Sequence, residues 1–405
     1  MFQLFKKERM WRDPMLKPRY DVVIAGAGVH GLAIAYYLGQ RGITNVAVLD
    51  KGYLGGGASA RSTAIIRANY VTPEGIPFFH ESVKLYEDLS QDLGYNLLFS
   101  QMGRLELAHT ESSIYALRLR ADANAVLGVD SRIIGPDDIR EMVPVLDMRQ
   151  GKDLPVLAAL YHPPGGVIRH DAVIWAYARA ADRQGAEIHP FTEITGINRS
   201  NGRVTGVETN RGPIQTDLVV NCTAAWSSTI AAMVGLDLPM VTHPLQAMVT
   251  EPLKPIFKLG VSSTSFHVYV YQTDRGELVI GGAVDHYTSY SLKSTFPMME
   301  ELSAGALRMF PFLKDVNILR QWTGICDMTP DYAPIMGPVS GLDGFLLDCG
   351  WGTYGFKAAP ISGKMMAELI DTGQTPDLIK PFSLARFSDG SLVNEKGAAS
   401  SAALH

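Results

Sequence analysis

Cysteine is scarce in this sequence of 405 residues, with only Cys222, Cys326 and Cys349 present. An odd number of cysteines at such wide spacing forms neither a disulfide framework nor a zinc pattern, so we predict no metal site. No run of about 18 apolar residues occurs, so we expect no membrane-spanning helix. Charged side chains between Lys6 and Asp13 interrupt the N-terminus, unlike a secretory signal peptide. Together these absences favour a protein of the reducing cytoplasm.

An excess of either charge is also absent. The net charge is −5, and charged residues make up 19% of the chain against 46% hydrophobic residues. These values are ordinary for a globular protein and give no electrostatic reason to expect nucleic acid or an anionic membrane as a partner. The length predicts two domains. The first 20 residues, which mix basic side chains with Phe2, Phe5 and Trp11, are either a solvated tail or an arm on a partner subunit.

The most informative stretch of the sequence runs from residue 20 to residue 51. A short apolar strand leads into a Gly-x-Gly-x-x-Gly turn, a helix over residues 32–41 and a second strand that ends at Asp50. Such glycines allow a tight turn, close approach of a pyrophosphate, and packing of helix on strand. The phosphates then lie at the helix N-terminus. Asp50, 19 residues after Gly31, is placed to bind an adenosine ribose. The residues predicted to bind the dinucleotide here are Gly26, Gly28, Val29, His30, Gly31, Asp50 and Lys51.

A second glycine-rich stretch covers residues 55–67. Its small and hydroxyl side chains suit close wrapping around a cofactor. Arg61 has the reach to contact a phosphate, with a surface cation as the alternative. Arg67 follows a short apolar run and is a candidate partner for a buried anion.

His170 is a third candidate for a functional residue. The Pro163–Gly166 turn delivers it to the start of a helix that ends at Gly185. A helix N-terminus disfavours an imidazolium, so His170 is expected to stay neutral and nucleophilic. Capping or packing is the alternative role for a single histidine.

Several segments together resemble the FAD-dependent amine oxidases of the D-amino-acid oxidase and sarcosine oxidase group. They are the opening glycine unit and residues 64–67, 329–331 (Thr-Pro-Asp) and 352–357. Residues 165–171 and 320–331 narrow the resemblance to the beta subunits of heterotetrameric sarcosine oxidases. The resemblance extends over nearly the whole chain.

The predicted fold class is α/β plus α+β, with a Rossmann-like FAD-binding domain and an interleaved substrate domain built on an antiparallel sheet. Alternating aromatic and β-branched residues between 239 and 284 predict that sheet. The expected boundaries are an N-terminal arm (1–20), an FAD-binding domain (21–90, 151–235 and 320–385), a substrate domain (91–150 and 236–319) and a C-terminal tail (386–405) that is frayed from Ser388 onward.

The resemblance implies two flavins. FAD would be bound noncovalently, and FMN would be bonded to His170, with His267 and Arg320 near its phosphate. FMN should lie where this subunit meets an alpha subunit, which would hold NAD and tetrahydrofolate, in a heterotetramer with gamma and delta subunits. Further FAD-binding residues implied by the resemblance are Ser59, Arg61, Ile66, Ile194, Gly352, Gly355 and Lys357.

One departure from the resembling proteins concerns cysteine. Monomeric sarcosine oxidases bind FAD through a cysteine six residues before the proline of the Thr-Pro-Asp motif. In this sequence that position is Gly324, and Cys326 is out of register. We therefore predict no cysteine-linked FAD.

The catalytic residues implied by the resemblance are Arg67 and Lys357, which match a carboxylate-binding pair, with Tyr70 and Thr353 as neighbours. Two cations favour the anionic amino acid and lower the pKa of its amine. The implied reaction is oxidation of the N-methyl group of sarcosine at FAD. Electrons would pass to FMN and then to oxygen, giving hydrogen peroxide, and the one-carbon unit would reach tetrahydrofolate.

Two alternatives stay open. An FAD-dependent dehydrogenase for proline or another secondary amino acid would share the cationic pair but need no histidine-linked FMN. A non-catalytic flavoprotein subunit that scaffolds a complex or carries electrons would not need the cationic pair at all.

Overall fold

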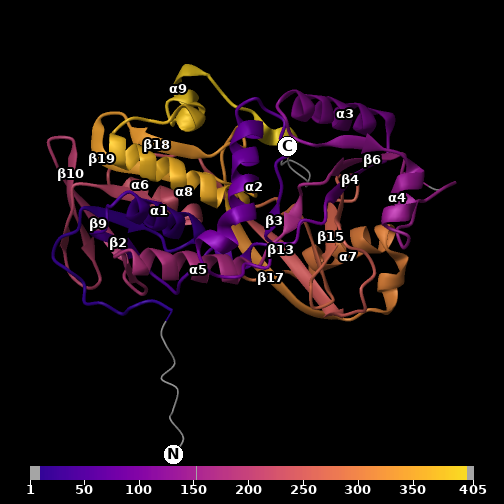
Figure 1. Ribbon diagram of the computed structural model, residues 1–405, viewed down its shortest axis with the longest axis horizontal. Helices are drawn as coiled ribbons and strands as arrows, with labels where there is room; N and C mark the ends of the chain where they lie inside the picture. Colours follow the sequence, from indigo (N-terminus) through magenta and orange to yellow (C-terminus); the bar gives the residue numbers. More distant parts are fainter. Residues whose placement is uncertain (1–9, 152, 399–405) are drawn as a thin grey trace, which may run out of the picture.

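The computed structural model describes residues 10–151 and 153–398. These residues form two large sheets that lie side by side (Figure 1). A two-stranded sheet of β3 (Ile65–Ile66) and β7 (Gly166–Val167) is a third, separate element.

The first sheet has nine strands in the described part of the chain. Its order is β11-β10-β19-β12-β1-β2-β8, with β18 beside β19 and β9 beside β10. The central pairs β2–β1, β1–β12 and β12–β19 are parallel, and β1, β2 and β12 are buried along their whole length. Apolar runs are typical of such strands, because helices cover both faces of a parallel sheet. The strands are β1 (Val22–Ala25), β2 (Val46–Leu49), β8 (Glu187–His189), β9 (Ile194–Ser200), β10 (Arg203–Thr209), β11 (Ile214–Gln215), β12 (Val219–Asn221), β18 (Ile335–Val339) and β19 (Leu342–Cys349).

Helices α1 (Val29–Gln40), α5 (His170–Arg183) and α8 (Gly355–Thr372) pack together beside the nine-stranded sheet, and α2 (Gly75–Asp92) packs on α8 (Figure 1). Helix α1 begins three residues before the start predicted from the sequence. Its contact with α8 is close, since a Cβ on Gly363 would lie 2.6 Å from the Cβ of Ala33. Glycine at position 363 therefore allows the two helices to approach each other.

The second sheet has eight strands in the order β17-β13-β16-β15-β14-β4-β6-β5. All of its neighbours in the described chain pair antiparallel except β14 and β4, which are parallel. Helix α7 (Phe296–Met309) packs on it through Leu302 and Met309, and α3 (Glu111–Val126) and α4 (Pro136–Met142) lie at its other end (Figure 1). The strands are β4 (Arg104–Ala108), β5 (Arg132–Ile134), β6 (Ala158–His162), β13 (Val241–Pro252), β14 (Gly260–Ser263), β15 (Val268–Gln272), β16 (Glu277–Val284) and β17 (Ile318–Met328).

Two segments differ from the domain boundaries predicted from the sequence. Strand β6 and strand β17 were both expected in the FAD-binding domain, but both pair within the eight-stranded sheet. The partner of a strand lies far away in the chain, so the apolar pattern of the strand alone does not identify the sheet that it joins. The division into two domains with these ranges otherwise stays a prediction.

The first and last residues that the structure describes, 10–20 and 386–398, both pack against the rest of the chain. The prediction of a tail that is frayed from Ser388 onward is wrong for residues 388–398, because Val393, Glu395 and Ala398 are buried. Helix α9 (Arg386–Asp389) also extends into this segment. Residues 10–20 pack on their own chain, where Arg12 pairs with Asp182 at 2.9 Å. The remainder of the predicted N-terminal arm, residues 1–9, lies outside the described residues.

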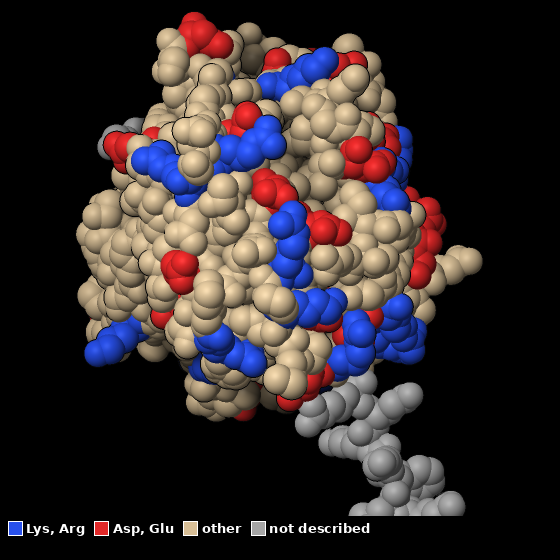
Figure 2. All heavy atoms as spheres, turned by 90° about the vertical axis from the view of Figure 1, so that its left-hand side faces the viewer, with Lys and Arg blue, Asp and Glu red and all other residues tan. Residues whose placement is uncertain are grey.

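No helix in the described ranges is long and apolar enough to cross a membrane. Figure 2 shows basic and acidic side chains interspersed on the end of the molecule that carries the nine-stranded sheet. The three cysteines are buried and form no disulfide bond.

Candidate active site

A cavity of about 670 Å³ is lined by residues of both large sheets. Its walls come from the β1–α1 turn, residues 50–65, the segment after β12, strands β13 and β17, and the turn before α8. The cavity has a glycine-rich end and a cationic end.

The glycine-rich end has the geometry that the sequence motif predicts. Gly26 adopts a φ of +106°, which only glycine tolerates readily. A Cβ on Gly31 would lie 2.0 Å from the carbonyl oxygen of Gly26, so glycine at 31 lets α1 pack directly on the turn. The amide of Ala27 donates to Asp50 at 2.8 Å, and the amide of Val29 donates to the Ser59 hydroxyl at 3.0 Å. The N-terminus of α1 thus faces the cavity, with a carboxylate at the end of β2 beside it.

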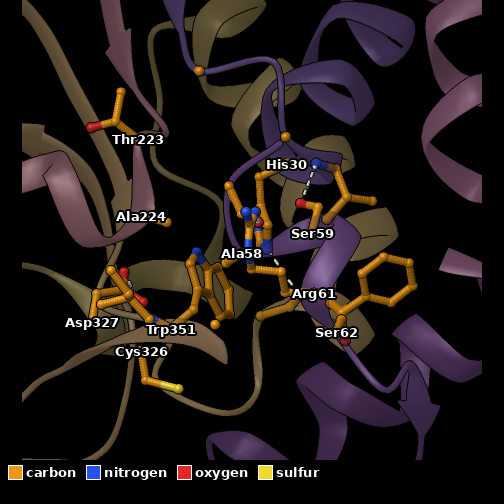
Figure 3. Close-up of a pocket in the computed structure, with 18 of the residues that line it drawn as sticks. His30, Ala58, Ser59, Arg61, Ser62, Thr223, Ala224, Cys326, Asp327 and Trp351 are labelled. Atoms are coloured by element: carbon orange, nitrogen blue, oxygen red, sulfur yellow. Dashed lines mark hydrogen bonds between the residues drawn. The ribbon is translucent and has the colours of Figure 1, made fainter. Parts of the chain in front are cut away.

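The predicted FAD-binding residues nearly all line this cavity. The residues that do so are Gly26, Gly28, Val29, His30, Asp50, Lys51, Ser59, Arg61, Ile194, Gly352, Gly355 and Lys357. Gly31 and Ile66 do not line it, since Gly31 lies beneath the turn and Ile66 is buried in β3. Figure 3 shows His30, Ser59, Arg61 and Ser62 on one side of the cavity and Thr223, Ala224, Cys326 and Asp327 on the other.

Arg61 is turned toward its own loop. Its guanidinium donates to the carbonyls of Gly56 and Gly57, and its own carbonyl accepts a hydrogen bond from the Trp322 indole at 2.9 Å. The side chain therefore closes the glycine-rich loop, and the backbone carbonyl of Arg61 links the loop to β17.

His30 joins the two glycine-rich turns of the cavity. One ring nitrogen lies 3.1 Å from the Asp348 carboxylate and the other lies 2.8 Å from the carbonyl oxygen of Gly355. Two acceptors require two N–H donors, so this geometry fits an imidazolium. Burial alone would lower the pKa of His30, but Asp348 outweighs it and the pKa is raised. His30 therefore connects the first turn of α1 to the first residue of α8 through a hydrogen bond.

The opposite end of the cavity is strongly cationic. Arg67, Arg104, Arg120 and Lys357 are 3%, 3%, 4% and 9% exposed, and Arg67, Arg104 and Lys357 line the cavity. Cations are rarely buried unless they are paired. The concentration of positive charge therefore needs an explanation.

Glu106 offsets part of this charge. Its carboxylate lies 3.4 Å from Arg104 and 3.2 Å from Arg120. Burial raises the pKa of Glu106, but Arg120 and Arg104 outweigh that effect and hold the pKa below its usual value. Arg104 and Glu106 are two residues apart on β4, so both side chains point to the same face of the strand.

Lys357 and Thr353 lie at the cavity wall near Arg67. The Lys357 ammonium donates to the carbonyl of Thr353 at 3.0 Å. Burial, followed by the charges of Arg67 and Arg104, lowers the pKa of Lys357 well below that of an ordinary lysine. An anion bound beside Lys357 would raise this pKa again, because it favours the charged ammonium.

Tyr70 differs from its predicted role. It is fully buried, stacks on Phe79 with ring centroids 3.6 Å apart, and does not line the cavity. The Arg67 guanidinium lies over its ring at 4.4 Å. Tyr70 therefore supports Arg67 from behind instead of facing the cavity.

Residues 21–369 match the family model of FAD-dependent oxidoreductases. The chain belongs to this family. The sarcosine oxidase subunit beta of Rhodobacter capsulatus is 44% identical over 393 residues, 97% of this chain and 94% of the relative. The subunit of the same name from Arthrobacter sp is 42% identical and is covered to 97% in both chains. The crystal structure of L-proline dehydrogenase from P. horikoshii has a TM-score of 0.87 at 31% identity, over 93% of this chain and 100% of that chain.

These similarities confirm the fold class and the resemblance to sarcosine oxidase beta subunits that the sequence predicts. They also confirm an FAD-dependent oxidoreductase of the amine-oxidising group. The glycine-rich end fits FAD, because it combines an open helix N-terminus, a carboxylate at the end of β2 and small residues along the wall.

Cys326 lines the cavity of this FAD-dependent oxidoreductase but is a poor nucleophile. Burial, with Asp327 nearby, raises the pKa of its thiol to about 12. A protonated thiol does not attack a flavin readily. This supports the prediction of noncovalent FAD, as does the presence of Gly324 at the register position of the cysteine in monomeric sarcosine oxidases.

His170 is the first residue of α5 and is half-buried. Within residues 10–151 and 153–398 its ring makes no hydrogen bond. Burial lowers its pKa, and the charges of Arg169 and Arg320 add to this effect against the opposing charge of Asp171. An imidazole that is neutral and makes no hydrogen bond among the described residues fits a residue that bonds to a flavin. The sequence-based expectation of a neutral ring agrees with this pKa direction.

The structure does not bring His267 and Arg320 together. Arg320 on β17 pairs with Val249 on β13, Val249 pairs with Val279 on β16, and Val279 pairs with Tyr271 on β15. His267 precedes Tyr271 by four residues. Four residues of a strand span roughly 13 Å, and two further strands separate the residues laterally. His267 lies at the β14–β15 turn with its Nδ1 buried and without a partner among the described residues. A shared phosphate contact for both residues is not supported.

Three residues of the cationic end are absent from the sequence prediction: Arg104, Glu106 and Arg120. The pattern Arg104-Leu105-Glu106-Leu107 is typical of an ordinary strand and matches no motif of the resembling proteins named above. Two opposite charges at alternate positions of an apolar strand are a usable signal, because they indicate a charged pair on one face. Arg120 carries no such signal, since it lies in a helix with exposed charges around it.

Proposed function

We propose that this chain oxidises the N-methyl group of sarcosine, giving glycine. The observation that carries the proposal is the buried charge at the cationic end: four cations, Arg67, Arg104, Arg120 and Lys357, against the carboxylates of Glu106 and Glu395. The excess is positive and lies beside the FAD cavity. One carboxylate of a small amino acid would offset part of it.

The chain's own residues would bind and orient this substrate. Arg67 offers a planar fork to the carboxylate, and Lys357 offers a point charge. Two cations near the substrate lower the pKa of its amine and favour the free base, whose methyl group can lose hydride. Bound FAD supplies the hydride acceptor.

The finer proposal is that electrons pass from FAD to FMN attached to His170 and reach oxygen as hydrogen peroxide. The half-buried neutral imidazole of His170 supports it, as does the proximity of Arg320 as a cation. By the same resemblance, the one-carbon unit would go to tetrahydrofolate in an alpha subunit that also holds NAD, and the partners would be alpha, gamma and delta subunits in the cytoplasm.

L-proline dehydrogenase is the second candidate function, because a protein of that name is 31% identical over most of this chain. Proline is also a secondary amine with a carboxylate, so the cationic end suits it equally. The discriminating measurement is the flavin that remains on acid-precipitated protein, since the sarcosine proposal requires covalent FMN and the proline proposal does not.

Lys357→Met tests the proposed function in the holoenzyme and its complex. Removing a buried cation that contacts the substrate carboxylate should slow loss of FAD absorbance after mixing with sarcosine by about 100-fold or more. Lys364→Met, on the exposed side of the same helix, should leave the rate unchanged. Unaltered turnover in Lys357→Met would instead favour a scaffold or electron-carrier subunit.

Intact mass under denaturing conditions tests the FMN proposal. We expect an FMN-sized addition that maps to the peptide carrying His170 and disappears in His170→Asn. A colourless denatured chain without added mass would rule covalent FMN out.

A further inference from the structure

The C-terminal segment, residues 386–398, is anchored at the Thr-Pro-Asp motif. Arg386 donates to both oxygens of Asp331, at 2.7 and 3.0 Å, and both side chains are 1% exposed or less. The Val393 amide donates to the same carboxylate at 3.1 Å, and the Glu395 amide donates to the Asp331 carbonyl at 2.8 Å. A bidentate buried pair with satisfied oxygens fixes the path of this segment.

Glu395 connects the segment to the loop that follows Arg67. Its carboxylate accepts hydrogen bonds from the Val71 amide, at 2.8 Å, and from the Thr72 hydroxyl. Its carbonyl accepts a hydrogen bond from the Tyr354 hydroxyl at 3.3 Å. The side chain is 2% exposed, so these contacts are made away from water. In Figure 1 the yellow end of the chain runs from α9 toward α2, which begins just after Thr72.

Ala398 completes the connection. Its carbonyl oxygen accepts a hydrogen bond from Nη2 of Arg67 at 2.5 Å, while Nη1 of Arg67 donates to the carbonyl and the side-chain oxygen of Asn69 at 3.0 and 3.1 Å. With its face on Tyr70, the guanidinium has one fixed orientation. Arginine has five N–H donors, so three hydrogen bonds leave two for a ligand in the cavity.

We propose that residues 386–398 are a positioning element of the carboxylate site: Glu395 shapes the loop after Arg67, and the Ala398 carbonyl turns the Arg67 guanidinium so that its remaining N–H groups face the cavity. This inference rests on the proposed function, because it assumes that Arg67 binds the substrate carboxylate. The C-terminal segment does not line the cavity itself, so it acts through Arg67.

The experiment compares three variants of the FAD-loaded complex. One ends after Asn394 and lacks both Glu395 and Ala398. The second is Glu395→Gln, which retains the shape of the side chain but loses its charge. The matched control ends after Ser400 and retains Glu395 and Ala398 within the chain.

Two readouts separate positioning from general damage. The first is kcat and KM for sarcosine and for its amide, which has no carboxylate. The second is the Kd of acetate, followed through the absorbance of bound FAD. Loss of a charge-assisted hydrogen bond to Arg67 should raise the KM for sarcosine and the Kd of acetate about 10- to 100-fold in the truncated chain. The amide should be affected less than threefold, on the order of ordinary surface effects.

Glu395→Gln should also raise the KM for sarcosine and the Kd of acetate, by a smaller factor. This variant decides the outcome if the truncated chain does not hold FAD. The control should match the full chain. Equal losses for sarcosine and its amide, or an unchanged Kd for acetate in both test variants, would overturn the proposal. If the full chain does not oxidise sarcosine, the proposed function fails, yet the acetate comparison still tests whether the segment orients Arg67.

Discussion

The two ends of the cavity are built in opposite ways. The glycine-rich end comes mostly from one continuous unit, in which the β1–α1 turn, α1 and β2 lie within 30 residues of one another. The cationic end collects Arg67, the neighbouring elements β4 and α3 with Arg104 and Arg120, Lys357 near the end of the chain, and Glu395 beyond it. A local unit keeps its geometry through backbone conformation, whereas the cationic end keeps its geometry through buried charge pairs.

This difference has an energetic consequence. Adding an atom to the glycine-rich end should disturb cofactor binding and little else. Removing one charge from the cationic end should disturb the fold as well as the substrate, because each cation there depends on a carboxylate that is also buried. Three measurements test this contrast.

The largest effect is expected for Glu106→Gln. The change leaves Arg104 and Arg120 without the carboxylate that lies 3.4 and 3.2 Å away. Breaking a buried charge pair by removing one partner costs about 3–5 kcal/mol in the free energy of unfolding. Urea denaturation of the FAD-loaded protein measures the loss. Glu111→Gln, at an exposed position of α3, serves as the control, and equal stability of the two variants would contradict the contrast.

A smaller effect, confined to the cofactor, is expected for Gly28→Ala. Gly28 lines the cavity, and its added Cβ would lie 3.1 Å from the Ser59 hydroxyl, a side-chain atom that can give way. The methyl group would occupy the space in which the pyrophosphate approaches the turn, so FAD binding should weaken about 10- to 100-fold, as measured by FAD titration of the apoprotein. Gly135→Ala is the control, since its Cβ would meet nothing within 4 Å and Gly135 does not line the cavity. Unfolding of Gly28→Ala without any change in FAD affinity would contradict the contrast.

The smallest effect is a proton taken up with the substrate carboxylate. Burial, Arg67 and Arg104 hold the pKa of Lys357 low in the free site, and a bound anion raises it again. Below the lowered pKa the lysine is already protonated, so no proton is taken up. Between the lowered and the restored pKa, binding of acetate should take up as much as about one proton. Calorimetry in buffers of different ionisation enthalpy measures this number, which should fall to zero in Lys357→Met.

The contrast also explains what the sequence could and could not predict. The turn at Gly26, its contact with Gly31 and the position of Asp50 follow from spacing alone, because the chain segments that meet are neighbours in sequence. Arg67 was predicted as a partner of a buried anion from its position after an apolar run, and Lys357 only through resemblance. Arg104 and Glu106 were missed although their alternation on one strand is a local signal, whereas Arg120 in its helix carries no local sign of the carboxylate that it meets in the fold.

The same reason accounts for the errors in the fold. Residues 151–235 and 320–385 were placed whole in the FAD-binding domain, whereas β6 and most of β17 within them pair in the eight-stranded sheet, and residues 388–398 were predicted to fray. In each case the determining contact is between residues far apart in the chain, such as Arg386 with Asp331 or Glu395 with Val71. Small and polar residues near the end of a chain look alike whether they are solvated or anchored.

The two-stranded sheet of β3 and β7 has a consequence for the distance between the two candidate sites. Ile65 pairs with Val167 and Ile66 pairs with Gly166, so Arg67 and His170 leave this antiparallel ribbon at opposite ends. The ribbon is a spacer of two residue pairs between the residue proposed to hold the substrate and the residue proposed to carry FMN. An insertion in β3 would displace Arg67 along the ribbon and an insertion in β7 would displace His170, so either change would alter the separation of the two positions.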